Sequence, residues 1–395
     1  MNSYSSYKDS GVEWNGEIPS HWDFVRLKYL FSLEGGKDSK SIQLEDGQYP
    51  ILGTGGEISR GSDFLYDKPT LLLGRKGTID KPFLYNEPFW VSDVMYYTIQ
   101  KKDVTPKYLY LLFTLIPFDY YRYGSTQPSM SRLDYESMYF PVPPLQERQK
   151  VIKYLDTKTQ KIDDLIEKTE KKIELLKEKR TSLINHCVTK GLNPNVEMKY
   201  SGVEWIGEIP SHYDIVRLKF LCSVKTGSRD TQDKVDDGDY PFYVRSPNIE
   251  RINSYSFDGE SVLTVGDGVG TGKVFHYVNG KFEFHQRVYK FSDFKRITGK
   301  FFYWFMKHHF IFVTEDQNSK STVDSLRRPL IDGFQFVIPS KEEQTQIVEY
   351  LDEQTQKIDF TIEKETQRTE LLKEYRQSLI SEVVTGKVDV RDYNG

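Results

Sequence analysis

The glycine-rich run GDGVGTGK, from Gly266 to Lys273, is the strongest sign of nucleotide chemistry in this 395-residue chain. A phosphate-binding P-loop needs the pattern GxxxxGK(S/T), in which the final hydroxyl binds magnesium. Asp267 stands where the first glycine is required, and Val274 stands where the hydroxyl is required. The run therefore predicts a tight hairpin turn whose glycines allow a nucleic-acid backbone to come close.

Three further groups of residues lack the neighbouring residues that a catalytic or metal-binding site needs. Residues 193–196, NPNV, are similar to the (D/N)PP(F/Y/W) motif of amino-methyltransferases, but the second proline and the aromatic residue are missing. The pair His308-His309 has no ligand partners nearby, and Cys187 and Cys222 are the only cysteines, too few for a zinc site or a disulfide framework. We therefore predict a chain with no catalytic residues, no metal and no cofactor of its own.

Composition and charge narrow the class of protein. The chain is 37% hydrophobic and 28% charged, with a net charge of −4. This balance argues against a lone, non-specific DNA binder, which needs a strong basic excess to release counterions. There is no apolar leader and no run of membrane-spanning length, and two cysteines suit a reducing compartment. We expect a cytoplasmic protein that makes no membrane contact.

The chain is an internal tandem repeat. Residues 10–31, SGVEWNGEIPSHWDFVRLKYLF, match residues 201–222, SGVEWIGEIPSHYDIVRLKFLC, at 17 of 22 positions. Residues 143–188 and 339–384 form a second matching pair, at an offset of 196. The blocks between these pairs are much less alike. The plan is therefore motif, variable block and helix, given twice.

Each repeated C-terminal segment has apolar spacing that alternates between three and four residues, which predicts a long helix with a heptad seam. The first seam is Ile152, Leu155, Thr159, Ile162, Ile166, Thr169, Ile173, Leu176, Arg180, Leu183 and Cys187. The second is Val348, Leu351, Thr355, Ile358, Ile362, Glu365, Thr369, Leu372, Arg376, Leu379 and Val383. The polar members weaken the seam but could fix its register. Two seams in one chain can satisfy each other, and some 40 residues make a rod of about 60 Å.

The variable blocks alternate strand-like runs with turns, followed by a helical stretch. Strands are expected at Thr70–Gly74, Phe89–Ile99, Ser261–Val265 and Phe282–Phe291, and helices at Pro106–Leu115 and Gly299–His309. The predicted fold is α+β: two mixed α/β domains separated by two long helices, in an internal pseudo-two-fold repeat. Predicted boundaries are 1–142 for the first domain, 143–190 for the first helix, 191–338 for the linker and second domain, and 339–395 for the second helix and tail.

These features together resemble the specificity subunit of Type I restriction-modification systems, HsdS. The resemblance rests on the paired GVEWxGEIPSH starts, the PPLQERQ approach to the first helix and the QKID, ELLKE and SLI positions of the helices, and it covers nearly the whole chain. It implies that each mixed α/β domain is a target recognition domain that reads half of a bipartite, asymmetric site in double-stranded DNA. It also implies that the two long helices form an antiparallel coiled coil, which sets the spacing between the half-sites.

The resemblance also implies partners. Such a subunit is non-catalytic and binds two HsdM-type methyltransferase subunits, which use S-adenosylmethionine to methylate adenine. HsdR-type restriction subunits, which use ATP and magnesium, then add translocation and DNA cleavage. Three alternatives remain open. The first is the specificity subunit of another methylase-nuclease system. The second is a protein adaptor, which sequence-selective DNA binding by the assembled complex would exclude. The third is an enzyme that itself binds S-adenosylmethionine.

Base-specific contacts need Arg, Lys, Asn, Gln, Ser or Thr side chains on loops or helix ends. The candidates in the first domain are Arg75, Lys76, Ser125, Thr126, Gln127, Ser131 and Arg132. Those in the second are Lys273, Gln286, Arg287, Lys320, Ser321, Thr322, Arg327 and Arg328. At the helix offset Ser125-Thr126 falls on Ser321-Thr322, which suggests an equivalent phosphate contact.

The repeated GVEWxGEIPSH segments cannot read two different DNA sequences, because they are almost identical. They either pack each domain onto its helix or face two identical partners. Trp14 and Trp205 in these segments, and Leu155 and Leu351 in the seams, are the candidate partner-binding residues.

Overall fold

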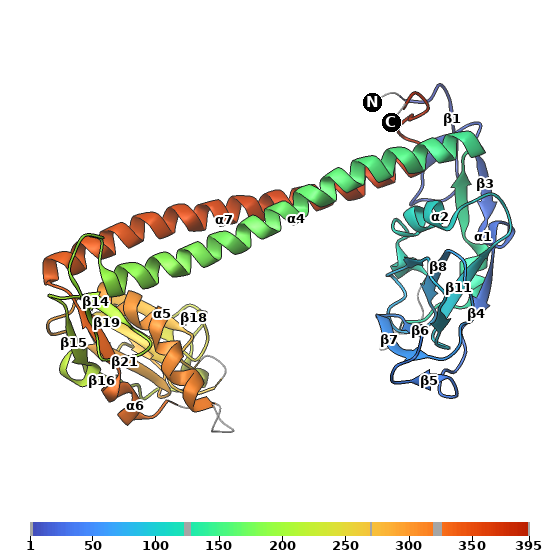
Figure 1. Cartoon of the computed structure of the whole chain (residues 1–395). Coiled ribbons are helices and arrows are strands. Elements are labelled where there is room, and N and C mark those ends of the chain that lie inside the picture. Colours follow the sequence, from blue (N-terminus) through green and yellow to red (C-terminus); the bar gives the residue numbers. More distant parts are fainter. Residues whose placement is uncertain (1–2, 122–127, 269–270, 319–325, 394–395) are drawn as a thin grey trace. The chain divides into compact units, whose positions relative to one another are not determined.

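The computed structural model describes residues 3–121, 128–268, 271–318 and 326–393. The chain forms two compact units: unit 1 is Met1–Thr169 with Gln367–Gly395, and unit 2 is Glu170–Thr366. The chain passes from one unit to the other twice, once inside the long helix α4 (Leu145–Lys190) and once inside the long helix α7 (Lys341–Val384), both labelled in Figure 1. Each unit therefore contains one variable block together with parts of both helices.

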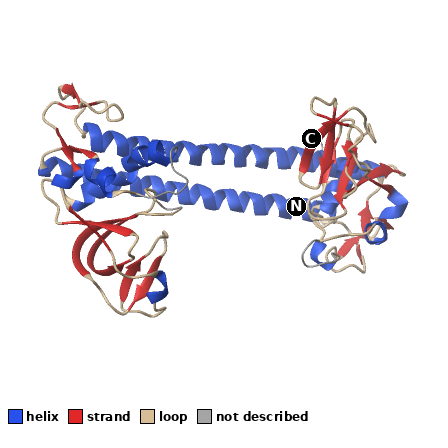
Figure 2. Ribbon diagram, turned by 90° about the horizontal axis from the view of Figure 1, so that it is seen from below, coloured by secondary structure: helices blue, strands red, loops and turns tan. Residues whose placement is uncertain are grey.

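Both units mix strands with helices, as Figure 2 shows, which confirms the predicted α+β class. The strands of unit 1 are β1 (Tyr7–Asp9), β2 (Glu17–Pro19), β3 (Asp23–Arg26), β4 (Phe31–Gly35), β5 (Gln43–Leu44), β6 (Tyr49–Gly53), β7 (Gly56–Gly61), β8 (Thr70–Gly74), β9 (Phe83–Tyr85), β10 (Trp90–Val91), β11 (Met95–Gln100) and β12 (Tyr139–Val142). Its shorter helices are α1 (Leu27–Leu30), α2 (Pro106–Phe113), the 3-10 turn η1 (Phe118–Tyr120) and α3 (Arg132–Ser137).

Unit 2 has a similar, though not identical, order of elements. Its strands are β13 (Met198–Tyr200), β14 (Glu208–Pro210), β15 (Asp214–Arg217), β16 (Ser223–Thr226), β17 (Tyr240–Tyr243), β18 (Ile249–Ile252), β19 (Phe257–Val265), β20 (Phe275–Phe284), β21 (Val288–Ser292) and β22 (Gln335–Ile338). Its shorter helices are α5 (Gly299–Asn318) and α6 (Arg328–Gly333), with 3-10 turns η2 (Leu218–Phe220) and η3 (Thr231–Asp233).

The sheets of the two units have matching topology although their sequences differ. Unit 2 has one six-stranded sheet in the order β16-β21-β19-β20-β17-β18. Unit 1 has two four-stranded sheets, β4-β11-β8-β9 and β10-β6-β7-β5. When β9 and β10 together are set against β20, the strand order of unit 1 matches that of unit 2, with β5 as an additional edge strand beside β7. The parallel pair β10–β6 corresponds to the parallel pair β20–β17.

The expected strands and helices are present, but both of the longer strand runs are interrupted, and the second helix continues to Asn318. The predicted run Phe89–Ile99 is broken into β10 and β11 by the turn Ser92–Val94, and the run Phe282–Phe291 is broken in the same way by His285–Arg287. Strands β19 and β20 pair antiparallel and form the predicted hairpin, and the described residues of the Gly-rich run lie between them.

Helix α7 begins at a capping box, in which the Ser340 hydroxyl accepts from the Glu343 N–H and the Glu343 carboxylate accepts from the Ser340 N–H, each at 3.2 Å. Both long helices are followed by a glycine in the left-handed region, Gly191 at φ +73° and Gly386 at φ +76°. A Cβ on Gly191 would lie 2.4 Å from the Tyr213 hydroxyl, and one on Gly386 would lie 2.3 Å from Pro19. Only glycine suits these two helix ends.

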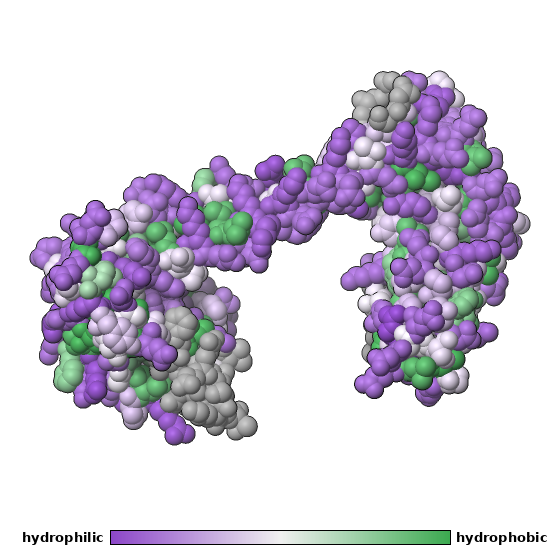
Figure 3. Space-filling model, in the orientation of Figure 1, coloured by the Kyte–Doolittle hydropathy of each residue, from purple (hydrophilic) through white to green (hydrophobic). Residues whose placement is uncertain are grey.

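The predicted seams are confirmed. Every seam residue of both helices is buried or half-buried, whereas some apolar residues off the seam, such as Leu165 and Leu371, are exposed. The surface along α4 and α7 is otherwise largely hydrophilic (Figure 3). Seam threonines satisfy their hydroxyls within the helix, as when Thr159 donates to the Leu155 carbonyl at 2.8 Å and Thr355 to that of Leu351 at 2.6 Å.

A matched pair of ion pairs fixes the antiparallel register of the helices. In unit 1 the Arg376 guanidinium donates to both carboxylate oxygens of Asp163, at 2.7 and 3.1 Å. In unit 2 Arg180 binds Asp359 in the same bidentate way, at 2.8 and 3.1 Å. Arg180 and Arg376 are the arginines of the predicted seams, and a shift of 196 residues converts one pair into the other. The two helices therefore pack by the same rule in each unit.

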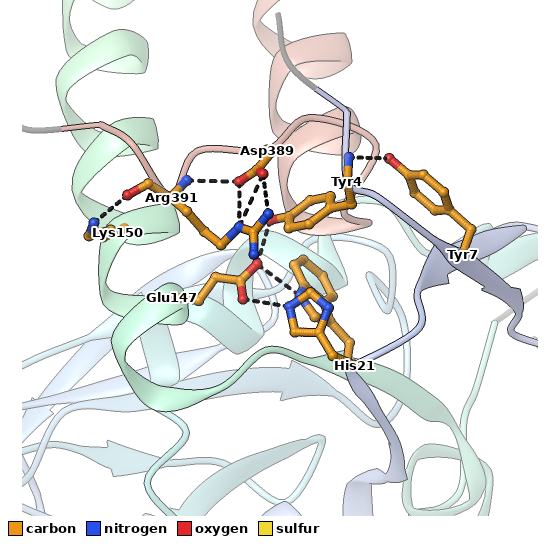
Figure 4. A network of polar contacts seen from close by, with 8 residues as sticks. Tyr4, Tyr7, His21, Glu147, Lys150, Asp389 and Arg391 are labelled. Carbon is orange, nitrogen blue, oxygen red and sulfur yellow. Dashed lines mark hydrogen bonds and ion pairs between the residues drawn. The ribbon is translucent and has the colours of Figure 1, made fainter.

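A polar network in unit 1 binds the first and last described segments to the start of α4 (Figure 4). The Glu147 carboxylate, 6% exposed, accepts hydrogen bonds from the Tyr4 hydroxyl and from Trp22 Nε1 at 2.9 Å, and it lies 2.8 Å from His21 Nε2. Burial is the largest cause that raises the pKa of Tyr4, and the hydrogen bond to Glu147 raises it further. The Tyr4 hydroxyl therefore keeps the proton that it donates. Arg391, paired with Asp389, lies over the Tyr4 ring.

Candidate nucleic-acid interface

Residues that the sequence places far apart meet at a loop following β8 in unit 1. The Arg75 N–H donates to the Val94 carbonyl at 2.8 Å, and the Arg75 carbonyl accepts from the Met130 N–H at 3.0 Å. Lys76 forms an isolated bridge with Ser129. The structure thus brings the predicted candidates Arg75 and Lys76 next to the segment that carries Ser131 and Arg132.

The side chains of this loop are free to meet a ligand. Arg75 and Lys76 are exposed. Among the residues that the structure describes, the Arg75 guanidinium donates a hydrogen bond to the backbone carbonyl of Asp93, at 3.3 Å. Thr54 lies beside the same loop, since a Cβ on Gly77 would be 3.6 Å from its hydroxyl. We call Thr54, Arg75, Lys76 and Asp93 the first loop cluster.

Unit 2 has an equivalent loop with different side chains. Gly266 takes the place of Arg75, because its N–H donates to the Arg287 carbonyl at 2.8 Å and its carbonyl accepts from the Leu326 N–H at 2.8 Å. The neighbouring side chains are charged and ion-paired. Asp267 binds Arg287 at 3.1 Å and lies 3.6 Å from Arg245. We call Arg245, Asp267, Gln286 and Arg287 the second loop cluster.

The two clusters share one backbone frame. Four pairs of hydrogen bonds between peptide groups correspond. Two are given above: Arg75 N–H to Val94 C=O corresponds to Gly266 to Arg287, and Met130 N–H to Arg75 C=O corresponds to Leu326 to Gly266. In the other two, Ser92 N–H to Leu52 C=O at 3.0 Å corresponds to His285 to Tyr243 at 2.9 Å, and Met95 N–H to Ser92 C=O at 3.1 Å corresponds to Val288 to His285 at 2.9 Å. A shared frame that holds dissimilar side chains is what two readers of different sequences need.

Gln286 and Lys273, predicted from sequence, also lie on exposed turns of unit 2. The Gln286 amide donates to Asp230 Oδ2 at 2.7 Å, which fixes its orientation and leaves its carbonyl oxygen available. Lys273 is exposed in the turn that precedes β20. Sequence reasoning missed Arg245, Asp267 and Asp230, because each becomes significant only through partners on other segments.

Other candidates are engaged in helix capping and ion pairs. Ser131 caps α3 and takes part in a capping box with Asp134. Arg132 binds Glu136 at 2.6 Å, and its counterpart Arg328 binds Asp332 at 2.7 Å, so this i,i+4 pair occurs in both units. The hydrogen bond that Arg132 donates to Glu136 raises the pKa of Arg132. Arg327 is exposed at the N-cap of α6.

Six candidates lie outside the described residues. These are Ser125, Thr126, Gln127, Lys320, Ser321 and Thr322. Their contact with DNA stays a prediction.

The candidate partner-binding residues fall into two groups. Trp14 and Trp205 are half-buried; Trp14 lies near Phe140, with ring centroids 6.4 Å apart, and Trp205 stacks on Phe334 at 5.7 Å. Both rings pack on their own domain and keep some surface. Leu155 and Leu351 are wholly buried in the two cores, which leaves no surface for another subunit to contact. Their packing partners lie within the chain.

The histidine and cysteine side chains hold no metal-like arrangement. Burial lowers the pKa of His309 to about 4 and that of His308 to about 3, so both rings are neutral at pH 7. Cys187 and Cys222 are free thiols. Within the described ranges, no three His, Cys, Asp or Glu side chains gather closely enough to bind a metal ion, and no helix there is long and apolar enough to cross a membrane.

The comparisons with known proteins agree on one family. The family model of the Type I restriction modification DNA specificity domain matches residues 19–175 and 210–373. The chain is 23% identical to the Type I restriction enzyme MjaVIII specificity subunit of Methanocaldococcus jannaschii, over 98% of both chains. It is 30% identical to the EcoDI specificity subunit of Escherichia coli over 182 residues, which cover 46% of this chain and 40% of that protein.

Solved structures show the same fold. A chain from a study of complex assembly and conformational transition of the type I R-M system matches with a TM-score of 0.70 at 14% identity, covering 94% of this chain and 99% of that one. The HsdS subunit of Thermoanaerobacter tengcongensis matches with a TM-score of 0.51 at 13% identity, over 94% and 98% of the two chains.

Proposed function

We propose, on the premise that this chain belongs to the Type I restriction modification DNA specificity family, that it is the DNA sequence-recognition subunit of a Type I restriction-modification complex. Each of its two recognition domains reads one part of a bipartite, asymmetric site. The first loop cluster contacts one half-site, and the second loop cluster contacts the other.

One observation carries this proposal: the two clusters share a backbone frame and differ in every side chain. Arg75 and Lys76 in unit 1 correspond to Gly266 and Asp267 in unit 2. Basic side chains suit guanine edges and phosphates, whereas a carboxylate held by arginines presents both signs of charge. Two domains of one fold therefore favour different bases, and a site read by both is asymmetric.

The partners and their cofactors belong to the assembled complex. We propose that two HsdM-type methyltransferase subunits, with S-adenosylmethionine, methylate adenine, and that HsdR-type restriction subunits, with ATP and magnesium, cleave DNA. The near-identical segments around Trp14 and Trp205 support a role in facing two identical subunits, because each ring keeps part of its surface exposed. The chain contributes no catalytic group, and we place the complex in the cytoplasm with the DNA.

Domain exchange is the direct test. Co-expression with the neighbouring methyltransferase gene, followed by single-molecule sequencing of host DNA, should reveal methylated adenines at one split, asymmetric site. Replacing residues 32–142 by the block of a relative should change one half of that site and leave the other half intact. If a complex forms and methylates no defined site, the DNA-recognition assignment is wrong and an adaptor role is favoured.

Arg75→Ala should weaken binding of the target duplex by the assembled complex by about 1–3 kcal/mol, the contribution of one good base contact. The loss arises because the exposed guanidinium of Arg75 is replaced by a methyl group while the backbone of the loop keeps its bonds. Arg26→Ala, at an exposed position on β3 outside the cluster, is the control. Unchanged affinity and an unchanged target for Arg75→Ala would remove Arg75 from the interface.

A further inference from the structure

The second loop cluster contains one carboxylate held between two arginines. The Arg287 guanidinium donates through Nη1 to both oxygens of Asp267, at 3.1 and 3.4 Å, and Arg245 Nη1 lies 3.6 Å from Asp267 Oδ1. These residues come from three segments: the connection from β20 to β21, the turn after β19 and the loop after β17. The Arg287 side chain is 51% exposed, so its head meets solvent while its orientation is set.

The backbone of Arg287 is fixed from two sides. Its N–H donates to His285 Nδ1 at 2.9 Å, and its carbonyl accepts from the Gly266 N–H at 2.8 Å. His285 is 1% exposed, and burial lowers its pKa, so the ring is neutral and Nδ1 can accept. The Cα of Arg287 is therefore anchored by buried groups, whereas Arg245 follows β17 on an exposed loop.

Stability does not explain the Asp267 arrangement, because ion pairs at exposed positions contribute little to folding. Orientation explains it better. Asp267 contacts Arg287 through Nη1 alone, so the Nε and Nη2 donors have no protein acceptor among the described contacts. Guanine presents two neighbouring acceptors, O6 and N7, in the major groove, and a guanidinium fork matches both.

We propose that Arg287 reads a guanine in the half-site of the second recognition domain, and that Asp267 is a positioning residue that holds the guanidinium for this contact. The proposal rests on the proposed function. In unit 1 the position of Arg287 is taken by Val94, so this reader exists in one half only. The contact made by Arg287 is therefore confined to one half-site, and Arg245 adds attraction for the neighbouring phosphates.

The test uses the complex assembled with its methyltransferase subunits. Its target is first mapped by sequencing of methylated DNA, and the half-site of unit 2 is assigned by exchange of residues 32–142, which alters the other half. Rates of methylation are then measured on duplexes that carry each of the four base pairs at each position. The variants are Arg287→Ala, Arg287→Lys and Asp267→Asn, with Arg217→Ala on β15 as an exposed control.

In the Arg287→Ala complex, preference for one G·C pair should fall by roughly 5- to 150-fold, the discrimination of one bidentate contact. Arg287→Lys keeps the charge but loses the fork, so it should lose much of the same preference. Asp267→Asn should weaken preference at the same base pair and leave the other half-site unchanged. Arg217→Ala should change neither half-site.

Three results would overturn the proposal. They are a unit 2 half-site without any G·C pair, full base preference in Arg287→Ala or Arg287→Lys, and loss of preference in Asp267→Asn alone, which would make Asp267 the reader. A complex that methylates no split site contradicts the proposed function itself. A split site that is indifferent to Arg287 contradicts only this inference.

Discussion

Replacing Glu147 by alanine should destabilise unit 1 by about 3–5 kcal/mol, the cost of removing a buried charged partner. The carboxylate accepts from the Tyr4 hydroxyl and Trp22 Nε1 and pairs with His21. Its loss leaves the Tyr4 and Trp22 donors in a dry environment without acceptors. Hydrogen exchange, followed by mass spectrometry, should show faster exchange in Tyr7–Asp9, in the start of α4 and in the residues after α7.

The second copy of the repeat supplies the matched control. Glu343 stands at the position of Glu147 and contacts His212 at 3.0 Å and the Tyr213 hydroxyl at 3.4 Å, but its side chain is 33% exposed. Glu343→Ala should therefore cost only about 1 kcal/mol, mostly through the lost helix cap. Equal losses for the two variants would show that burial of Glu147 is not what gives the network its strength.

Leu155→Ala should lower the free energy of unfolding of unit 1 by about 2–5 kcal/mol, the range for a buried leucine that leaves a cavity. Leu155 is wholly buried in the core that also contains Leu379 and Val383 of α7. Chemical denaturation, with hydrogen exchange to assign the transition to unit 1, measures the effect. A denaturation curve for the whole chain is not two-state, because two units contribute.

Leu165→Ala is the control, since Leu165 lies on the same helix, off the seam, and is 41% exposed. This change should stay within about 0.5 kcal/mol of the parent. Leu351→Ala, at the matching seam position, should repeat the large effect in unit 2. A large loss for Leu165→Ala would mean that the helix packs on a second face.

The seams were predictable because a helix that buries one face needs apolar residues at alternating spacings of three and four, and this pattern can be recognised in the sequence. The same holds for strands such as Thr70–Gly74, a buried apolar run that ends at a glycine. The bidentate pairs could be anticipated only in part, as polar seam residues that fix register. Their acceptors, Asp163 and Asp359, follow from the antiparallel pairing, which no local pattern gives.

The candidate interface was less accessible to sequence reasoning. The frame around Arg75 and Gly266 consists of peptide hydrogen bonds, which leave no signature in residue type. The ion pair of Asp267 with Arg287 joins residues 20 positions apart on different segments. The turn Ser92–Val94 was hidden inside an apolar run, because the residues on both sides of it are buried strands.

The peptide frame has an evolutionary consequence. Where main-chain groups hold the frame of a loop, substitutions of its exposed side chains carry little risk to folding, so the side chains that contact DNA can change while the frame persists. The contrast within this one polypeptide, Arg75 and Lys76 in one half and Gly266 and Asp267 in the other, is what such divergence between two copies of a repeat produces. New specificities can then arise through a few mutations at these positions, with the helices and their register inherited intact.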